Sequence, residues 1–210
     1  MEYKMSIGSL SKFTVPLASD QSSTTQGQLM PKLQNRFRVM FENFGVSGNT
    51  TELTKQVAAA SRPSFDTDNI EYWVYNSRIN LFGRPKWKPL EITIRDDILG
   101  NVAKLVGEQV QRQFDFYEQS AARTGQDYKF TTKIEMLDGG NGSNVQVLEA
   151  WACYGCFITP DWNATPLDYK SQEIMVIKLT IQPDNCLQLV GGIDSNNPPP
   201  SGAGGTMITG

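Results

Sequence analysis

Apolar and polar positions alternate along much of the chain. In the segment 36–42, Phe37, Val39 and Phe41 face one way, and mostly charged residues face the other. An alternation with period two predicts a strand that buries one face. Three more segments predict strands on the same pattern, at 128–136, 145–158 and 174–181.

Two further segments are part of the same pattern. The glycine-rich stretch 138–144 predicts a tight turn between neighbouring antiparallel strands. The segment 52–60 is polar and alanine-rich, so it fits either a strand or a short helix, and the sequence leaves both open.

One segment has the period of a helix. Its apolar residues recur at spacings of three and four: Ile98, Val102, Leu105, Val106, Val110, Phe114 and Tyr117. This stripe predicts an amphipathic helix from Asp97 to about Gln119. Asp96 and Asp97 stand at its start, where carboxylates accept free backbone N–H groups. Adjacent carboxylates at a helix start favour a capping role over acid–base chemistry.

The segment 70–97 predicts a β-hairpin of unusual composition. Its first arm is rich in β-branched and aromatic residues, and Gly83, Pro85 and Pro89 interrupt it before the alternating segment 90–95. The expected tip mixes polar, cationic and large apolar residues: Asn76, Arg78, Ile79, Asn80, Leu81 and Phe82, followed by Arg84 and Trp87. Such a mixture is typical of a surface that contacts a partner.

These elements sum to about six or seven strands and one helix. They predict a mainly β, α+β fold: an antiparallel β-sandwich or partly closed barrel with one flanking α-helix. The folded domain is expected at 33–188. Residues 1–32 form an N-terminal arm, which is either disordered or packed on a neighbouring subunit, and residues 189–210 form a Gly/Pro-rich tail.

Composition narrows the possible functions. The 210-residue chain has a net charge of -3 and a pI near 5.1, which argues against a dedicated nucleic-acid binder. It contains no histidine, which excludes every imidazole-based mechanism. We therefore expect no enzyme, no catalytic residue and no cofactor. The sequence also lacks an apolar run long enough for a signal or membrane segment.

Three cysteines, Cys153, Cys156 and Cys186, are too few for a disulfide framework and indicate synthesis in a reducing cytoplasm. The Cys153-x-x-Cys156 spacing invites a metal or redox interpretation. It lies in an expected strand, however, where residues three apart point to opposite faces. Structural packing is therefore favoured, and no metal site is expected.

An ordered series of short matches along residues 33–188 resembles the tail tube proteins of contractile-tailed bacteriophages, the myovirus inner tube family, which is related to secretion-system tube proteins. The first match runs through Asn76-Ser-Arg78-Ile-Asn80-x-x-Gly83-Arg84, then Trp87 and Asp96-Asp97. The others are Asp127-Tyr-Lys-Phe130, Leu137-Asp-Gly, Gly155-Cys-Phe157 and Asp184-Asn-Cys186.

The resemblance implies a structural virion protein that forms stacked hexameric rings inside a contractile sheath. Its expected partners are further copies of itself and the tail sheath, baseplate, tape measure and tail terminator proteins, with DNA crossing the lumen without specific binding. The implied location is the virion tail, assembled in the host cytoplasm. The hairpin would supply the contacts between subunits or rings through Asn76, Arg78, Asn80, Phe82, Gly83, Arg84 and Trp87.

Two alternatives remain open. The first is a related tube component, either a baseplate tube initiator or a secretion-system tube protein, which only its partners would distinguish. The second is a ligand- or carbohydrate-binding β-sandwich, in which exposed Trp73, Trp87 or Trp162 would form the binding platform. Changes in Trp fluorescence on adding sugar to a stable monomer would favour that second alternative.

Overall fold

The computed structural model describes residues 32–46, 50–139, 145–159, 163–164 and 167–189. The chain divides into two units, Met1–Asn35 and Arg36–Gly210. In the first unit only residues 32–35 are described, and they include a turn at 34–35. All described helices and strands belong to the second unit. Residues 1–31 of the predicted arm (1–32) and residues 190–210 of the predicted tail (189–210) lie outside the described residues, whereas Leu189 belongs to a strand.

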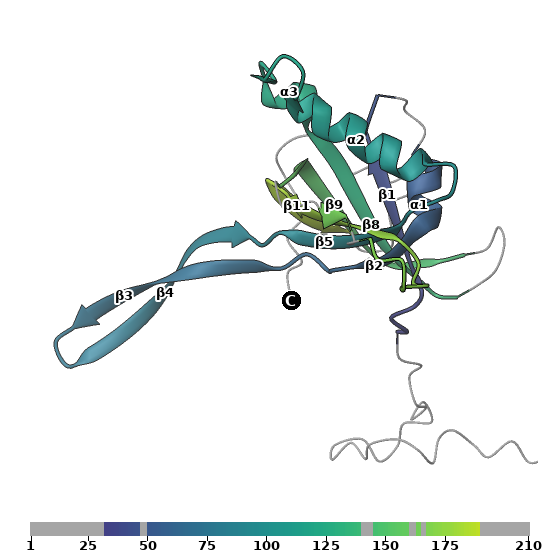
Figure 1. The fold of residues 1–210 in the computed structure, drawn as a ribbon. Helices are drawn as coiled ribbons and strands as arrows, with labels where there is room; N and C mark the ends of the chain where they lie inside the picture. The colour runs from purple at the N-terminus through teal and green to yellow at the C-terminus, as the bar shows by residue number, and fades with distance from the viewer. Residues whose placement is uncertain (1–31, 47–49, 140–144, 160–162, 165–166, 190–210) are drawn as a thin grey trace, which may run out of the picture. The chain divides into compact units, whose positions relative to one another are not determined.

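An antiparallel sheet dominates the second unit (Figure 1). Its strands follow the order β1 (Phe37–Glu42), β8 (Phe130–Leu137), β9 (Val147–Ile158), β11 (Val176–Gln182), β5 (Leu90–Arg95) and β2 (Val57–Ala60). Two shorter strands pair with this path: β12 (Asn185–Leu189) with β9, and β10 (Asn163–Ala164) with β11. The predicted mainly β, antiparallel fold is confirmed, and the sheet does not close into a barrel.

The strand predictions hold for β1, β8, β9 and β11. The undecided segment 52–60 contains both kinds of structure, because α1 (Thr51–Gln56) leads directly into β2. The strand expected at 174–181 is not the last strand, since β12 follows it and pairs with β9. The turn predicted at 138–144 lies largely outside the described residues, but β8 and β9 pair antiparallel on either side of it.

The main helix, α2 (Asn101–Gln113), is shorter than predicted at both ends. Ile98 and Tyr117 are fully exposed, and Phe114 already belongs to β6 (Phe114–Asp115), which pairs with β7 (Ser120–Ala121). A one-turn helix, α3 (Gly125–Tyr128), follows. Within the described residues there are thus three helices rather than one, of which α1 and α3 are very short.

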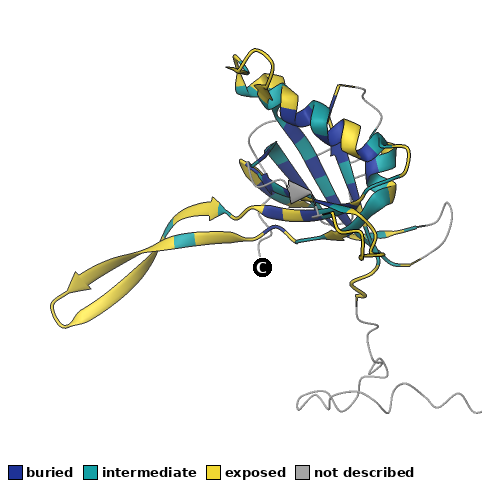
Figure 2. Ribbon diagram, viewed as in Figure 1, coloured by how far each residue is buried: buried dark blue, intermediate teal, exposed yellow. Residues whose placement is uncertain are grey.

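The buried stripe of α2 lies against the apolar face of the sheet, where Figure 2 shows both elements buried. Gln109 is fully buried and joins two loops: its Oε1 accepts the Gly45 N–H at 2.9 Å, and its Nε2 donates to the Tyr128 carbonyl at 2.6 Å. Gln113 pairs with both backbone groups of Ile158, at 2.7 and 2.8 Å. These side chains fix α2 to β9 and to the surrounding loops, so polar contacts supplement apolar burial.

The three cysteines are all buried and free. Gly155 has φ +64° and sits where the β8–β9 register shifts, so β9 carries a bulge there. The bulge adds one residue to β9, so residues on its two sides no longer follow the regular alternation of faces. As a result, Cys153 and Cys156 both lie in the core cluster with Cys186. The expectation that their side chains point to opposite faces is therefore wrong, although the expected structural packing holds. A hydrogen bond with Cys186 and burial raise the pKa of Cys153, and burial raises the pKa of Cys156 to about 11.

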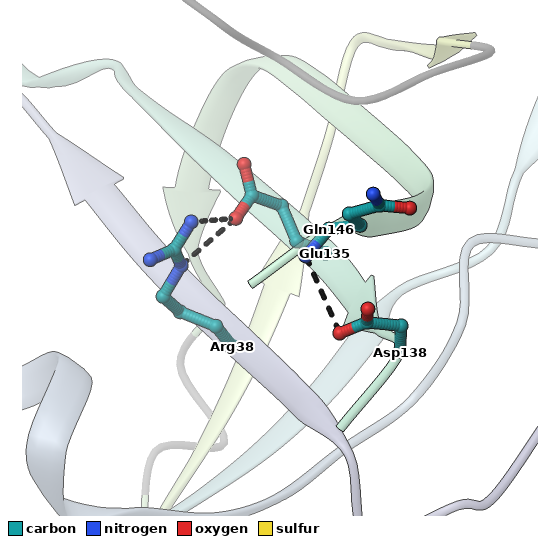
Figure 3. Close-up of polar contacts among 4 residues, drawn as sticks. All are labelled: Arg38, Glu135, Asp138 and Gln146. Carbon is teal, nitrogen blue, oxygen red and sulfur yellow. Dashed lines mark hydrogen bonds and ion pairs between the residues drawn. The ribbon is translucent and has the colours of Figure 1, made fainter. Parts of the chain in front are cut away.

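The opposite face of the sheet holds a buried carboxylate (Figure 3). Glu135 of β8 is fully buried, and its Oε2 accepts hydrogen bonds from Nε and Nη2 of Arg38 on β1 at 2.8 and 2.5 Å. Asp138 and Gln146 then join the ends of β8 and β9, since the Asp138 N–H donates to the Gln146 carbonyl at 3.0 Å. These contacts connect β1, at the edge of the sheet, to β8, and β8 to β9.

Candidate assembly interface

Among the residues that the structure describes, strands β3 (Phe65–Val74) and β4 (Ser77–Trp87) pair only with each other and form a long two-stranded ribbon. The turn lies at Tyr75 and Asn76, and Tyr75 has φ +53°, as the first turn residue of a type II′ turn does. The predicted hairpin is present, but its arms are wrong. Residues 77–87, most of which were assigned to the tip and to the interruption after it, form the second arm as β4. The segment 90–95, expected as the second arm, is β5, which pairs with β11 and β2 inside the main sheet.

Both faces of the ribbon are exposed along its length, as the yellow colouring of β3 and β4 in Figure 2 shows. The register places Ile70 opposite Leu81 and Tyr72 opposite Ile79. Because side chains of paired residues lie on the same face, one side of the ribbon is almost entirely apolar. We call it the apolar face; it consists of Ile70, Tyr72, Val74, Ile79 and Leu81.

The other face carries the polar candidates. Trp73 lies opposite Arg78, Glu71 opposite Asn80, and Asn69 opposite Phe82. The Arg78 guanidinium lies over the Trp73 ring, 5.6 Å from its centroid, and Arg78 Nη1 is 3.2 Å from Glu71 Oε1. Phe82, one of the large apolar residues of the expected tip, therefore lies on this face and not with Ile79 and Leu81. Asn76 lies in the turn itself.

Gly83 does not form a turn but allows a bulge. Between Thr67 and Asn69 the register shifts, so that Asp68 faces both Gly83 and Arg84. A Cβ on Gly83 would lie 1.7 Å from the Asp68 carbonyl oxygen, so no larger residue fits without moving the backbone. The glycine therefore lets the two strands stay paired past the bulge.

Trp87 anchors the base of the ribbon to the sheet. Its ring meets Phe65 edge to face, with centroids 5.4 Å apart, and its Nε1 donates to Asn185 Oδ1 at 3.2 Å. Gln182 Nε2 donates to the Trp87 carbonyl at 3.0 Å. Because Trp87 packs partly buried against its own core, its predicted place in an intersubunit contact stays a prediction.

The predicted helix cap is only partly present. The N-cap residue of α2 is Gly100, with φ +70°, rather than Asp96 or Asp97. The Asp97 carboxylate nevertheless accepts the Val102 N–H at 3.1 Å, which satisfies one free donor of the first turn. Asp96 accepts the N–H of Asp97 instead, so it does not contact the helix through this bond.

The part of the chain that the structure describes gives little support for other kinds of site. It contains no cluster of three or more His, Cys, Asp or Glu residues arranged to hold a metal ion. Among the same residues, no helix has both the length and the apolar character needed to cross a membrane. Of the three tryptophans proposed as a ligand platform, Trp73 is exposed, Trp87 is partly buried, and Trp162 lies outside the described residues.

The sequence did not single out the apolar face as a site. Ile70, Tyr72 and Val74 become a surface only when the turn is placed at residues 75–76, because the register then aligns them with Ile79 and Leu81. In the sequence, the signal for this surface was the alternation of apolar and polar residues within the first arm. In the structure, those apolar residues are not part of the core.

Comparison with known proteins supports the same class of fold. No protein-family model matches the sequence, and no curated protein matches it either. Solved structures do match. The tube-terminating cap of the anti-feeding prophage is 16% identical over 84% of this chain and 99% of that chain, with a TM-score of 0.58.

Two structures of the PVC extracellular contractile injection system match as well. A chain of its extended sheath–tube complex is 18% identical over 76% of this chain and 92% of that chain, with a TM-score of 0.52. A chain of its sheath/tube terminator is 15% identical over 78% of this chain and 100% of that chain, with a TM-score of 0.50. This chain therefore has the fold found in tube and terminator components of contractile injection systems, as the sequence resemblance implied.

Proposed function

We propose that this protein is a structural subunit of the tube of a contractile tail or injection apparatus. The observation that carries the proposal is the ribbon: an exposed apolar face, unpaired within the described part of the chain, on a fold shared with tube components. Monomeric proteins rarely expose a continuous apolar surface of this kind unless it binds a partner.

More specifically, we propose that the protein forms the tail tube of a phage. Six copies would form a ring, rings would stack inside a sheath between the baseplate and a terminator, and a tape measure protein and then DNA would occupy the lumen of the virion tail. The acidic chain suits passage of DNA without adhesion: six copies carry 6 × -3 = -18 charges, although only lumen-facing groups would act on the phosphates.

A second candidate is a terminator, favoured by the tube-terminating cap among the matching structures. A baseplate tube initiator and a secretion-system tube protein remain within the same class. The work of all these proteins would be mechanical, and we propose no catalytic activity, because the chain contains no histidine that could serve as a base.

The test is a chain with a shortened ribbon. Asn69 and Phe82 are register partners, so residues 70–81 can be replaced by Asn-Gly, which favours a two-residue hairpin turn. We expect the wild type to form rings or tubes at high concentration in negative-stain electron microscopy. The shortened protein should stay unassembled, with a melting temperature within about 3 °C of the wild type, because the removed residues contribute nothing to the core.

Tubes formed equally well by the shortened protein would remove the ribbon from the assembly mechanism. A wild type that stays monomeric at every concentration, with and without a preformed baseplate, would contradict the tube proposal. Binding of a sugar by that monomer, seen in its Trp fluorescence, would favour a ligand-binding module instead.

A further inference from the structure

The chain has a second exposed apolar surface, outside the ribbon. Ile98 and Leu99 follow β5, and Ile174 and Met175 precede β11; all four are exposed. The Asp96 N–H donates to the Met175 carbonyl at 3.0 Å, which holds the two segments together at one end of the antiparallel β5–β11 pair. We call Ile98, Leu99, Ile174 and Met175 the acceptor patch.

The ribbon and the acceptor patch lie at opposite ends of β5. The ribbon joins β5 at Leu90 through residues 88–89, whereas the patch begins just after Arg95. A six-residue strand is about 20 Å long, so the two surfaces are separated by the height of the sheet. The ribbon leaves the sheet at its own end (Figure 1), so a copy cannot cover its own patch.

The charge around the acceptor patch is opposite to that of one edge of the ribbon. Strand β4 carries Arg78, Arg84 and Lys86 and no acidic residue, whereas β3 carries Asp66, Asp68 and Glu71 and no basic residue. The ribbon is therefore neutral as a whole, with +3 along its β4 edge and -3 along its β3 edge, and Arg78 is paired with Glu71 of the same ribbon. The segments 96–99 and 173–175 contain Asp96, Asp97 and Glu173 and no basic residue, which gives -3, with Arg95 as the nearest flanking cation. The acidic segments therefore favour an orientation of docking that places the β4 edge, and not the β3 edge, beside them.

We propose that the apolar face of the ribbon in one copy docks on the acceptor patch of a second copy, with the β4 edge facing the acidic segments. This inference rests on the proposed tube function and specifies its contact. The contact is heterologous, because two different surfaces of the same chain meet, so a docked pair keeps one free ribbon on one copy and one free patch on the other for further copies.

The test uses two variants that are purified separately. Ile79→Asp/Leu81→Asp removes the apolar face, and Ile98→Asp/Leu99→Asp removes the patch. Each variant alone should fail to form the tubes that the wild type forms. When they are mixed in equal amounts, an intact ribbon and an intact patch become available, so the particle mass in light scattering should double, whether the variants start as monomers or as single rings.

Tyr117→Asp is the matched control, because Tyr117 is fully exposed and lies outside both surfaces. It should assemble as the wild type does. Circular dichroism melting curves check that every variant folds; all changed side chains are exposed, so we expect melting temperatures within about 3 °C of the wild type.

Three results would overturn the inference. Normal tubes formed by Ile98→Asp/Leu99→Asp would show that the ribbon docks elsewhere, for example on another ribbon, while leaving the tube function intact. A mixture whose particle mass does not double would exclude a ribbon–patch contact. A wild type that never assembles would instead overturn the proposed function, and this inference with it.

Discussion

The ion pair between Arg38 and Glu135 is the contact in the described sheet for which a single substitution should cost most. The Glu135 side chain is fully buried, whereas that of Arg38 is 45% exposed. Removing the guanidinium leaves a buried carboxylate without its counter-charge, which typically costs more than the pair itself contributes. We expect Arg38→Met to lower the free energy of unfolding by about 3 kcal/mol in urea denaturation at pH 7.

The double substitution Arg38→Met/Glu135→Met should recover most of this loss, because it leaves no buried charge. The exposed pair Lys55–Glu52 is the control, and Lys55→Met should cost less than about 0.5 kcal/mol. Equal losses in Arg38→Met and the double variant would contradict the assignment of the cost to an uncompensated carboxylate.

Burial of the cysteines should make stability depend on alkaline pH. The folded chain raises the pKa of Cys156 to about 11 from an ordinary value of 9.0. Between these values the unfolded chain loses a proton that the folded chain keeps, so the free energy of unfolding falls as pH rises, by about 1.4 kcal/mol per pH unit per thiol. Below pH 9 this dependence should disappear.

Urea denaturation at pH 8, 9, 10 and 10.5 checks this expectation. Cys156→Ala should be less stable than the wild type at every pH because of the cavity it creates. Above pH 9, however, its free energy of unfolding should fall less steeply with pH than that of the wild type, by the contribution of one thiol. Identical slopes would show that Cys156 does not titrate between the two states in this range.

At the scale of elements, Gly83 determines whether the ribbon keeps its register. Because a Cβ there would meet the Asp68 carbonyl oxygen, Gly83→Val should break the pairing of β3 and β4 beyond the bulge. We expect the amides of residues 69–82 to exchange hydrogen at least about tenfold faster in mass spectrometry, with the unfolding free energy changed by less than about 1 kcal/mol. Tube formation should be lost.

Gly107→Ala is the control for that substitution. A Cβ at Gly107, in α2, would meet nothing within 4 Å, so this change should stabilise the helix by up to about 1 kcal/mol and leave ribbon exchange and assembly unchanged. A Gly83→Val protein with unchanged ribbon exchange would show that the backbone accommodates the bulge without glycine.

The hairpin also shows what the sequence could and could not predict at this scale. Its existence was predictable from β-branched and aromatic residues, but Gly83 and Pro85 were taken to interrupt the chain before the second arm, whereas β4 continues through both. The true turn at Tyr75 and Asn76 contains neither glycine nor proline, so local turn chemistry gave no strong signal there.

The predicted ends of the main helix were wrong for a related reason. Val102, Leu105, Val106 and Val110 form the buried stripe, as predicted. Ile98 and Tyr117 continue the same spacing but are exposed, because periodicity does not reveal whether the chain still packs on the sheet. Gly100, in a left-handed conformation, marks the actual start of the helix.

At the scale of the whole molecule, the sequence predicted the class of fold but not the acceptor patch. Ile98 and Met175 are distant in sequence, and only the pairing of β5 with β11 brings their segments together. The same limit applies to the cysteine cluster, which needed the bulge at Gly155 and the unpredicted strand β12. Sites formed by long-range pairing cannot be predicted from local patterns alone.

The concentration dependence of assembly should separate a tube subunit from a terminator. A heterologous contact either closes into a ring of fixed size or continues into an open polymer. A tube subunit uses its surfaces to continue, so above a critical concentration all added protein should enter tubes. In sedimentation experiments the protein left in the supernatant should then reach a plateau, and the plateau should rise with salt because the β4 edge of the ribbon and the acidic segments beside the acceptor patch carry opposite charges. A terminator would instead give one discrete particle mass over the whole range, without a plateau. That result would favour the cap-like alternative and would restrict the ribbon to a single contact at the end of another protein's tube.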